Sequence, residues 1–129
     1  MRVLIDGQPA TLDTRRVLGE GGEATVLLHG GRNHKCAVKL YKQPPASADK
    51  LRALVAIAPG LDTIAALPRA LVSDVRTGAV LGFTMALCEP GFEPLAMLAK
   101  LSFRAQLGID LGGVLSLFST FHAELEAIH

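Results

Sequence analysis

RVLGEGGEATV, residues 16–26, places three glycines within four positions between two runs that each contain a valine. Glycine weakens the interior of a strand unless the backbone bends sharply or another group approaches it closely. The segment therefore predicts a β-hairpin in which Arg16–Leu18 pairs with Thr25–Leu28 and the glycines form the connection. These glycines serve either the turn itself or a ligand that lies against the backbone.

The residues on both sides of this hairpin predict further short strands. Asp6-Gly7 separates the apolar runs Val3–Ile5 and Ala10–Leu12, and an Asp-Gly pair between two such runs is typical of a hairpin turn. Downstream, Cys36–Tyr41 is an apolar run that contains one lysine. The first third of the chain is therefore predicted to be a meander of short strands.

The middle of the chain predicts one helix and two more strands. Ser47 is a suitable N-cap for a helix over residues 47–58, and Pro59-Gly60 predicts the end of that helix. The runs Arg69–Ser73 and Ala79–Met85 flank a turn and predict two further strands.

The last third of the chain predicts a helix, because apolar residues recur there every three or four positions. These residues are Val114, Phe118, Phe121, Leu125 and Ile128. The fold class expected is α+β, with a small antiparallel β-sheet and one helix followed by C-terminal helices. Residues 1–88 are expected to form the first domain, and residues 89–129 to form the helical start of a second one.

Composition excludes several classes of function. The 129 residues include 13 Lys and Arg against 12 Asp and Glu, so no electrostatic footprint for nucleic acid or an anionic membrane surface is present. Two cysteines, Cys36 and Cys88, make neither a disulfide framework nor a zinc cluster. No secretory signal and no apolar stretch of about 20 residues occurs, so a cytoplasmic protein is expected.

The glycine segment has the form G-x-G-x-x-A-x-V, with Gly19, Gly21, Ala24 and Val26 at the informative positions. A dinucleotide site needs its glycines between a strand and a helix, but here the chain continues as a strand, which favours a flap over phosphate groups. No G-x-x-x-x-G-K-[ST] segment is present. Thirteen residues after Val26 comes Lys39, within the apolar strand Cys36-Ala37-Val38-Lys39.

The flap and this lysine resemble the N-terminal lobe of a protein kinase, and the resemblance extends over residues 16–129. It implies ATP as the ligand, with Mg²⁺ only in a complete kinase. The flap would cover the phosphates, Lys39 would hold the α- and β-phosphates, and Val26 and Ala37 would form an apolar lid over adenine. Met85 would lie at the back of the adenine pocket. The remaining residues implied are Gly19, Glu20, Gly21, Gly22 and Ala24 in the flap and Ala86, Leu87 and Cys88 in the hinge.

The sequence departs from the kinase pattern in two respects. An active kinase pairs the strand lysine with a glutamate of the following helix, whereas Asp49 is the only acid within residues 47–58 and lies opposite the apolar face. Asp49 at a distorted helix start, another acid such as Asp62, or no acid at all would then partner Lys39. The chain also contains neither an H-R-D-like catalytic loop nor a D-F-G segment.

Three functions follow from these observations. The first is the ATP-binding lobe of a protein kinase-like phosphotransferase that is catalytically incomplete as this chain, with a protein as substrate. The second is a non-catalytic, pseudokinase-like module for regulation or partner contact. The third is a structural fold in which the glycines only make a turn.

The C-terminal helix raises two further questions. His122, Glu126 and His129 share one helix face, but their order differs from H-E-x-x-H, and we expect no metal site there. The apolar residues of the same helix are expected to pack onto the sheet domain, to pair with a second copy of the chain, or to promote aggregation.

Overall fold

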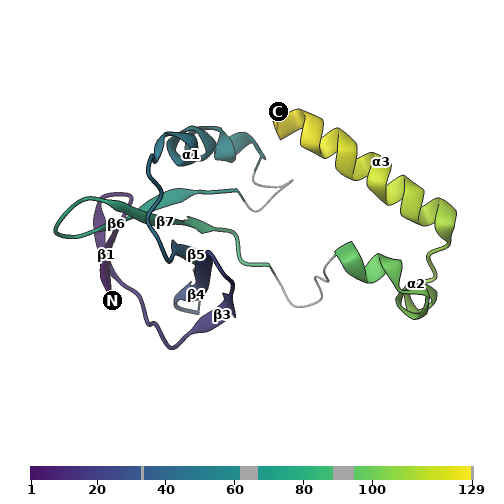
Figure 1. Ribbon diagram of the computed structural model, residues 1–129, viewed down its shortest axis with the longest axis horizontal. Coiled ribbons are helices and arrows are strands. Elements are labelled where there is room, and N and C mark those ends of the chain that lie inside the picture. The colour runs from purple at the N-terminus through teal and green to yellow at the C-terminus, as the bar shows by residue number, and fades with distance from the viewer. Residues whose placement is uncertain (33, 62–66, 89–94, 129) are drawn as a thin grey trace. The chain divides into compact units, whose positions relative to one another are not determined.

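The computed structural model describes residues 1–32, 34–61, 67–88 and 95–128 (Figure 1). The chain divides into two compact units, Met1–Cys88 and Glu89–His129. Within the described residues, the first unit contains all of the strands and one helix, and the second contains helices only.

The first unit is a curled sheet of seven antiparallel strands in the order β2-β1-β6-β7-β5-β4-β3. The strands are β1 (Arg2–Ile5), β2 (Gln8–Thr11), β3 (Val17–Glu20), β4 (Ala24–Gly30), β5 (Lys35–Tyr41), β6 (Ala70–Asp74) and β7 (Val80–Met85). Each lies within two residues of a run that the sequence predicts as a strand, because the turn residues between them are strong local signals. The α+β class is therefore confirmed.

The N-terminal hairpin of β1 and β2 turns at Asp6-Gly7, where both residues have positive φ, 49° and 77°. Positive φ at both central residues is the requirement of the tight hairpin turn that an Asp-Gly pair favours. Strand β1 also pairs with β6, with Leu4 opposite Ser73, and so joins this hairpin to the rest of the sheet.

The hydrophobic core lies on one face of the sheet. Its centre is formed by side chains that are at most 2% exposed: Val3, Leu12, Leu27, Val38 and Val72. Residues alternate between faces along a strand, so Val26 and Lys39, which flank Leu27 and Val38 and oppose each other, belong to the other face. The core thus fixes the register that directs Lys39 away from it.

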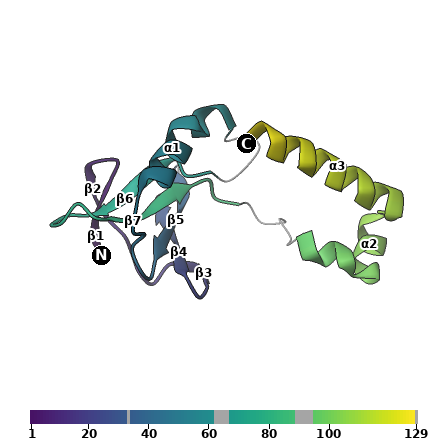
Figure 2. The same cartoon turned by 45° about the horizontal axis from the view of Figure 1, so that its top comes forward.

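Helix α1 (Asp49–Leu61) packs against β6 (Figure 1 and Figure 2). Ala48, whose carbonyl accepts the N–H of Arg52, is the N-cap residue in place of the predicted Ser47, while the Ser47 Oγ accepts the backbone N–H of Asp49 at 3.2 Å. The prediction that Pro59 ends the helix is wrong, because the helix continues to Leu61. Proline lacks the N–H that would bond to the carbonyl four residues earlier, and its ring crowds that carbonyl, but α1 contains Pro59 in its last turn all the same.

Strands β5 and β7 approach closely at Gly82. A Cβ atom at this position would lie 1.9 Å from the carbonyl oxygen of Lys39. Only glycine fits there without moving the backbone of β5, so Gly82 contributes directly to the placement of the strand that carries Lys39.

The second unit contains a short 3₁₀ segment, Leu95–Ala99, followed by α2 (Leu101–Leu107) and α3 (Leu111–Ile128). Gly108 ends α2 in the left-handed conformation, with φ 64°. The Asp110 Oδ1 accepts the N–H of Gly113 at 2.7 Å and caps the start of α3. The helical prediction for the last third of the chain agrees with these elements.

Large apolar side chains of the second unit are exposed, among them Leu101 (74%), Leu111 (66%) and Leu115 (62%). Sequence periodicity alone does not tell whether such a face is covered. Across the described ranges, no helix has both the length and the apolar character that a membrane crossing requires.

Candidate functional site

The glycine loop connects β3 to β4 and is closed by one backbone hydrogen bond, from the N–H of Gly21 to the carbonyl of Ala24 at 2.9 Å. Gly19 lies opposite Val26 and Glu20 opposite Thr25, so the hairpin predicted from the sequence is confirmed. A register shift between Val17 and Gly19 marks a bulge in β3. Such bulges bend a strand locally.

The fold of the first unit does not itself require glycine in this loop. None of Gly19, Gly21 and Gly22 has a positive φ. A Cβ atom at Gly19 or Gly22 would meet no atom within 4 Å, and one at Gly21 would make an ordinary contact of 3.9 Å. Neither strain nor packing within the chain therefore explains these three residues, which leaves the approach of another molecule as a physical reason for them.

Lys39 lies on β5 directly opposite Val26 of β4 and Phe83 of β7. Its Nζ is 5.4 Å from the centroid of the Tyr41 ring and 5.9 Å from that of Phe83. The two rings contact each other edge to face, with centroids 6.2 Å apart. A cation above aromatic rings at these distances is held by about 0.5–1 kcal/mol at an exposed site, so the rings orient the ammonium without neutralising it.

The loop and the lysine border one open hollow of about 440 Å³. It is lined by Gly19, Glu20, Gly21, Gly22, Glu23, Ala24, Val26 and Lys39. A volume of this size lies in the range of small-molecule sites. The structure thus brings together all of the predicted flap residues with Val26 and the predicted lysine.

Apart from Val26, the residues predicted around adenine do not line this hollow. Ala37, which is 3% exposed, lies directly opposite Met85, and its position two residues before Lys39 places it on the same face of the sheet. Ala86 and Leu87 follow β7 and are half-buried, whereas Cys88 is exposed. Val26, Ala37 and Met85 therefore share a face with the lysine.

Of the three alternatives for the partner of Lys39, Asp49 is excluded in this structure. Asp49 pairs instead with Arg52 at 3.4 Å, and its side chain is 87% exposed. Asp62 lies outside the described residues. Where the structure is described, no carboxylate forms an ion pair with Lys39, so its charge is available to an anion.

Lys42, which the sequence did not single out, contacts the loop from just after the end of β5. The Lys42 ammonium lies 3.0 Å from a carboxylate oxygen of Glu20. A second hollow, of about 560 Å³, is lined by Gly22, Glu23, Tyr41, Lys42 and Gln43. The pairing of Glu20 with Lys42 depends on the register of three strands, for which a single sequence carries no local signal.

The two cysteines are free. Cys36 is half-buried, and burial raises the pKa of its thiol. A raised pKa lowers the thiolate fraction and with it the nucleophilicity of this residue, so Cys36 is better suited to packing than to catalysis.

The C-terminal histidines do not form a metal site in the described part of the chain. His122 Nε2 lies 3.4 Å from a carboxylate oxygen of Glu126, an i,i+4 pair on the surface of α3. His129 lies outside the described residues. Among residues that are described, no group of three or more His, Cys, Asp or Glu is placed to hold a metal ion.

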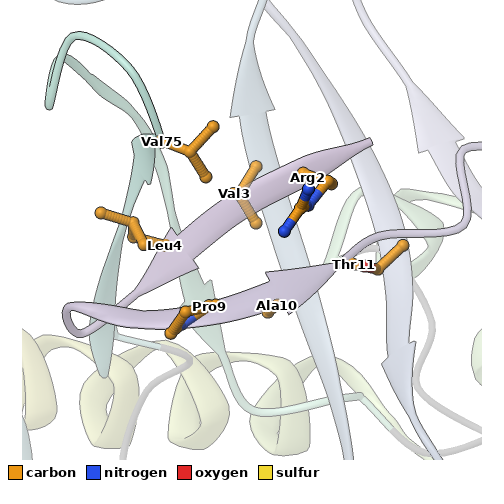
Figure 3. Close-up of a pocket in the computed structure, with 7 residues that line it drawn as sticks. All are labelled: Arg2, Val3, Leu4, Pro9, Ala10, Thr11 and Val75. Atoms are coloured by element: carbon orange, nitrogen blue, oxygen red, sulfur yellow. The ribbon is translucent and has the colours of Figure 1, made fainter.

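A third hollow, of about 370 Å³, lies on the N-terminal hairpin (Figure 3). Its lining residues are Arg2, Val3, Leu4, Pro9, Ala10, Thr11 and Val75. They include no acid, histidine or cysteine, so the hollow offers contact surface but no acid–base chemistry. It lies at the β2 edge of the sheet, whereas the glycine loop lies at the β3 edge.

The hollow between the glycine loop and Lys39 is therefore the candidate site. It combines exposed loop backbone and the Lys39 ammonium with two glutamates, of which Glu20 is paired with Lys42. The backbone N–H groups and the ammonium are the groups that could bind an anion such as phosphate. No protein-family model matches this chain, and no curated protein or solved structure does. A functional assignment thus depends on the geometry of the site and on the sequence motif.

Proposed function

We propose that the first unit is the ATP-binding lobe of a protein kinase-like phosphotransferase. The observation that carries this proposal is the shared hollow of Lys39 and the glycine loop. The loop glycines have no role in the chain's own packing, and a phosphate that approaches the backbone closely would give them one.

The sheet supports a site for the adenine base next to this phosphate site. Val26, Ala37 and Met85 provide apolar side chains on the face that carries Lys39. The order of the elements also agrees with the kinase-like resemblance: the glycine hairpin, the lysine strand, helix α1, the strands β6 and β7, and then helices.

Catalysis requires groups beyond the glycine loop and Lys39. A base for the substrate hydroxyl and ligands for Mg²⁺ are needed for phosphoryl transfer. The segments that supply these groups in a kinase, the H-R-D-like loop and D-F-G, do not occur in the sequence, and the described residues contain no group of three potential metal ligands. We accordingly propose ATP binding for this chain and transfer only in a complete kinase.

A pseudokinase-like regulatory module is the second candidate, and one observation favours it. Asp49 points into solvent and pairs with Arg52, so the described residues lack the lysine–acid pair that an active kinase needs. A protein would then be the regulatory partner of the module rather than its substrate. Both candidates are proposed to act in the cytoplasm, where thiols such as Cys36 and Cys88 stay reduced.

Nucleotide titration followed by NMR tests the proposal. We expect weak ATP binding, with a Kd on the order of 0.1–1 mM, because the hollow is open and the loop glycines are exposed. Lys39→Ala should weaken binding by at least about tenfold, since a hydrogen bond to a charged group contributes about 1.5–3 kcal/mol. Lys35→Ala removes a lysine from the same strand outside the hollow and should leave the affinity unchanged.

Three results would contradict the proposal. Complete absence of ATP binding would favour a purely structural role for the glycines. An unchanged affinity in Lys39→Ala would remove the lysine from the site. Submicromolar binding would show that the described hollow is not the whole of the binding site.

A complete kinase allows a second test, in which Lys39→Ala should abolish phosphotransfer. If the unmodified complete protein itself transfers no phosphate, the regulatory module is favoured.

A further inference from the structure

Lys42 holds both ends of the glycine loop. Its backbone N–H donates to the carbonyl oxygen of Glu23 at 2.8 Å. Its ammonium forms an ion pair with Glu20 at 3.0 Å. One residue at the end of β5 thus contacts the first and last residues of the segment 20–23.

The strand register places Glu20 on the face of the sheet opposite to Lys39. Glu20 lies opposite Thr25, and Thr25 lies opposite Leu40. These three residues therefore share a face, whereas Gly19, Val26 and Lys39 share the other. Glu20 also lines the hollow beside Lys39, whereas Lys42 does not, so the ion pair restrains one wall of the hollow from outside it.

Little else within the chain restrains the tip of this loop. Gly22 has no side chain, and even a Cβ atom there would meet nothing within 4 Å. Glycine loses more conformational freedom on ordering than any other residue. A loop that is already ordered binds its ligand more tightly, because less of this entropy is lost on binding.

We propose that Lys42 is a positioning residue, which orders the glycine loop over the Lys39 hollow for contact with phosphate groups. This inference rests on the proposed nucleotide function. Lys42 acts through the loop backbone and does not itself touch the ligand. The Lys42 side chain is 45% exposed and that of Glu20 is 62% exposed. We therefore expect loss of this ion pair to weaken ATP affinity about two- to fivefold, the range typical of surface pairs.

The test uses Glu20→Gln, Lys42→Gln and the charge exchange of Glu20→Lys with Lys42→Glu in the full chain. The hydrogen exchange rate of the Gly21 amide reports on the loop, because this amide donates the bond that closes it. ATP and adenosine titrations separate phosphate contacts from base contacts. Lys35→Gln is the matched control, since it removes the same charge from the other end of β5.

We expect faster Gly21 exchange and a two- to fivefold loss of ATP affinity in both neutral variants, about the range for a surface pair. Adenosine affinity should not change, and the charge exchange should restore both quantities. A Gly21 exchange rate equal to that of the unmodified chain would overturn the inference. Equal losses for ATP and adenosine would also overturn it, because they indicate a general structural effect.

Failure of the nucleotide function itself has a different signature. If Gly21 exchange accelerates in the variants while the unmodified chain binds neither ATP nor adenosine, the loop-ordering role of Lys42 is supported and the ATP assignment is overturned.

Discussion

Individual glycines in this chain have opposite physical roles. At Gly82 a Cβ atom would lie 1.9 Å from the Lys39 carbonyl oxygen and 2.9 Å from its carbon. Both are backbone atoms, which cannot move aside without shifting β5. At Gly22 the same atom would meet nothing within 4 Å. The first glycine is thus needed for the fold, and the second is free to serve a ligand.

Alanine substitutions separate these two roles. Gly82→Ala should lower the free energy of unfolding by roughly 1–3 kcal/mol, the usual cost of overpacking. Gly22→Ala should change it by no more than about 0.5 kcal/mol, as surface substitutions usually do. Urea denaturation of the two variants measures both values. A large loss of stability in Gly22→Ala would mean that the loop glycine is required by the chain itself.

Among the secondary-structure elements, the sequence predicts correctly those features that depend on a few neighbouring residues. Asp6-Gly7 predicts a hairpin because its backbone conformation suits that turn, and the structure contains the hairpin. The sequence predicts that α1 ends before Pro59, but the helix includes this proline and continues to Leu61. The pairing of β1 with β6 joins residues about 70 positions apart, and contacts of such separation have no signature in a single sequence.

The candidate site divides in the same way. The glycine flap and Lys39 could be predicted because their residue types and spacing form a motif. The contact of Lys42 with Glu20 could not, because it depends on how β3, β4 and β5 align. The contact of Lys39 with Phe83 could not, because it depends on how β5 and β7 align. The residue types in the sequence thus identify the groups proposed to bind a ligand. The alignment of the strands determines which other residues contact those groups.

The turn between β6 and β7 provides a prediction about acid stability. The Asp74 carboxylate accepts the backbone N–H groups of Thr77 at 2.8 Å and Arg76 at 2.9 Å. These bonds favour the charged form and hold the pKa of Asp74 below its ordinary value of 3.8. A depressed pKa stabilises the folded state above the unfolded-state pKa, and this contribution is lost as the pH falls through the folded-state pKa.

Asp74→Asn keeps an oxygen acceptor for the turn but removes its titration. The free energy of unfolding of the unmodified chain should therefore decrease more steeply below pH 3.8 than that of the variant. Urea denaturation at a series of acidic pH values measures this difference. Identical acid dependence in the two proteins would show that the turn hydrogen bonds do not perturb Asp74 in solution.

At the scale of the whole molecule, most of the exposed large apolar side chains belong to the second unit. Phe118 and Phe121 of α3 are 47% and 49% exposed, and Leu115 is 62% exposed. From Leu111 to Ala123 the helix contains no Asp, Glu, Lys or Arg. The formal net charge of the chain is only +1, so charge repulsion between copies is weak. Exposed apolar surface of this kind tends to associate.

We therefore expect the full chain to self-associate through α3 as its concentration rises. Leu115→Lys combined with Phe118→Lys should weaken association at least about tenfold, because burial of each large apolar side chain contributes about 1.5–3 kcal/mol. Ser116→Lys combined with Ser119→Lys is the matched control, since it adds the same charge to the same helix at exposed polar positions. Sedimentation velocity over a range of concentrations compares the three proteins. Equal weakening by both pairs would attribute the effect to charge rather than to the apolar residues, and a concentration-independent monomer would refute the expectation that α3 pairs with a second copy.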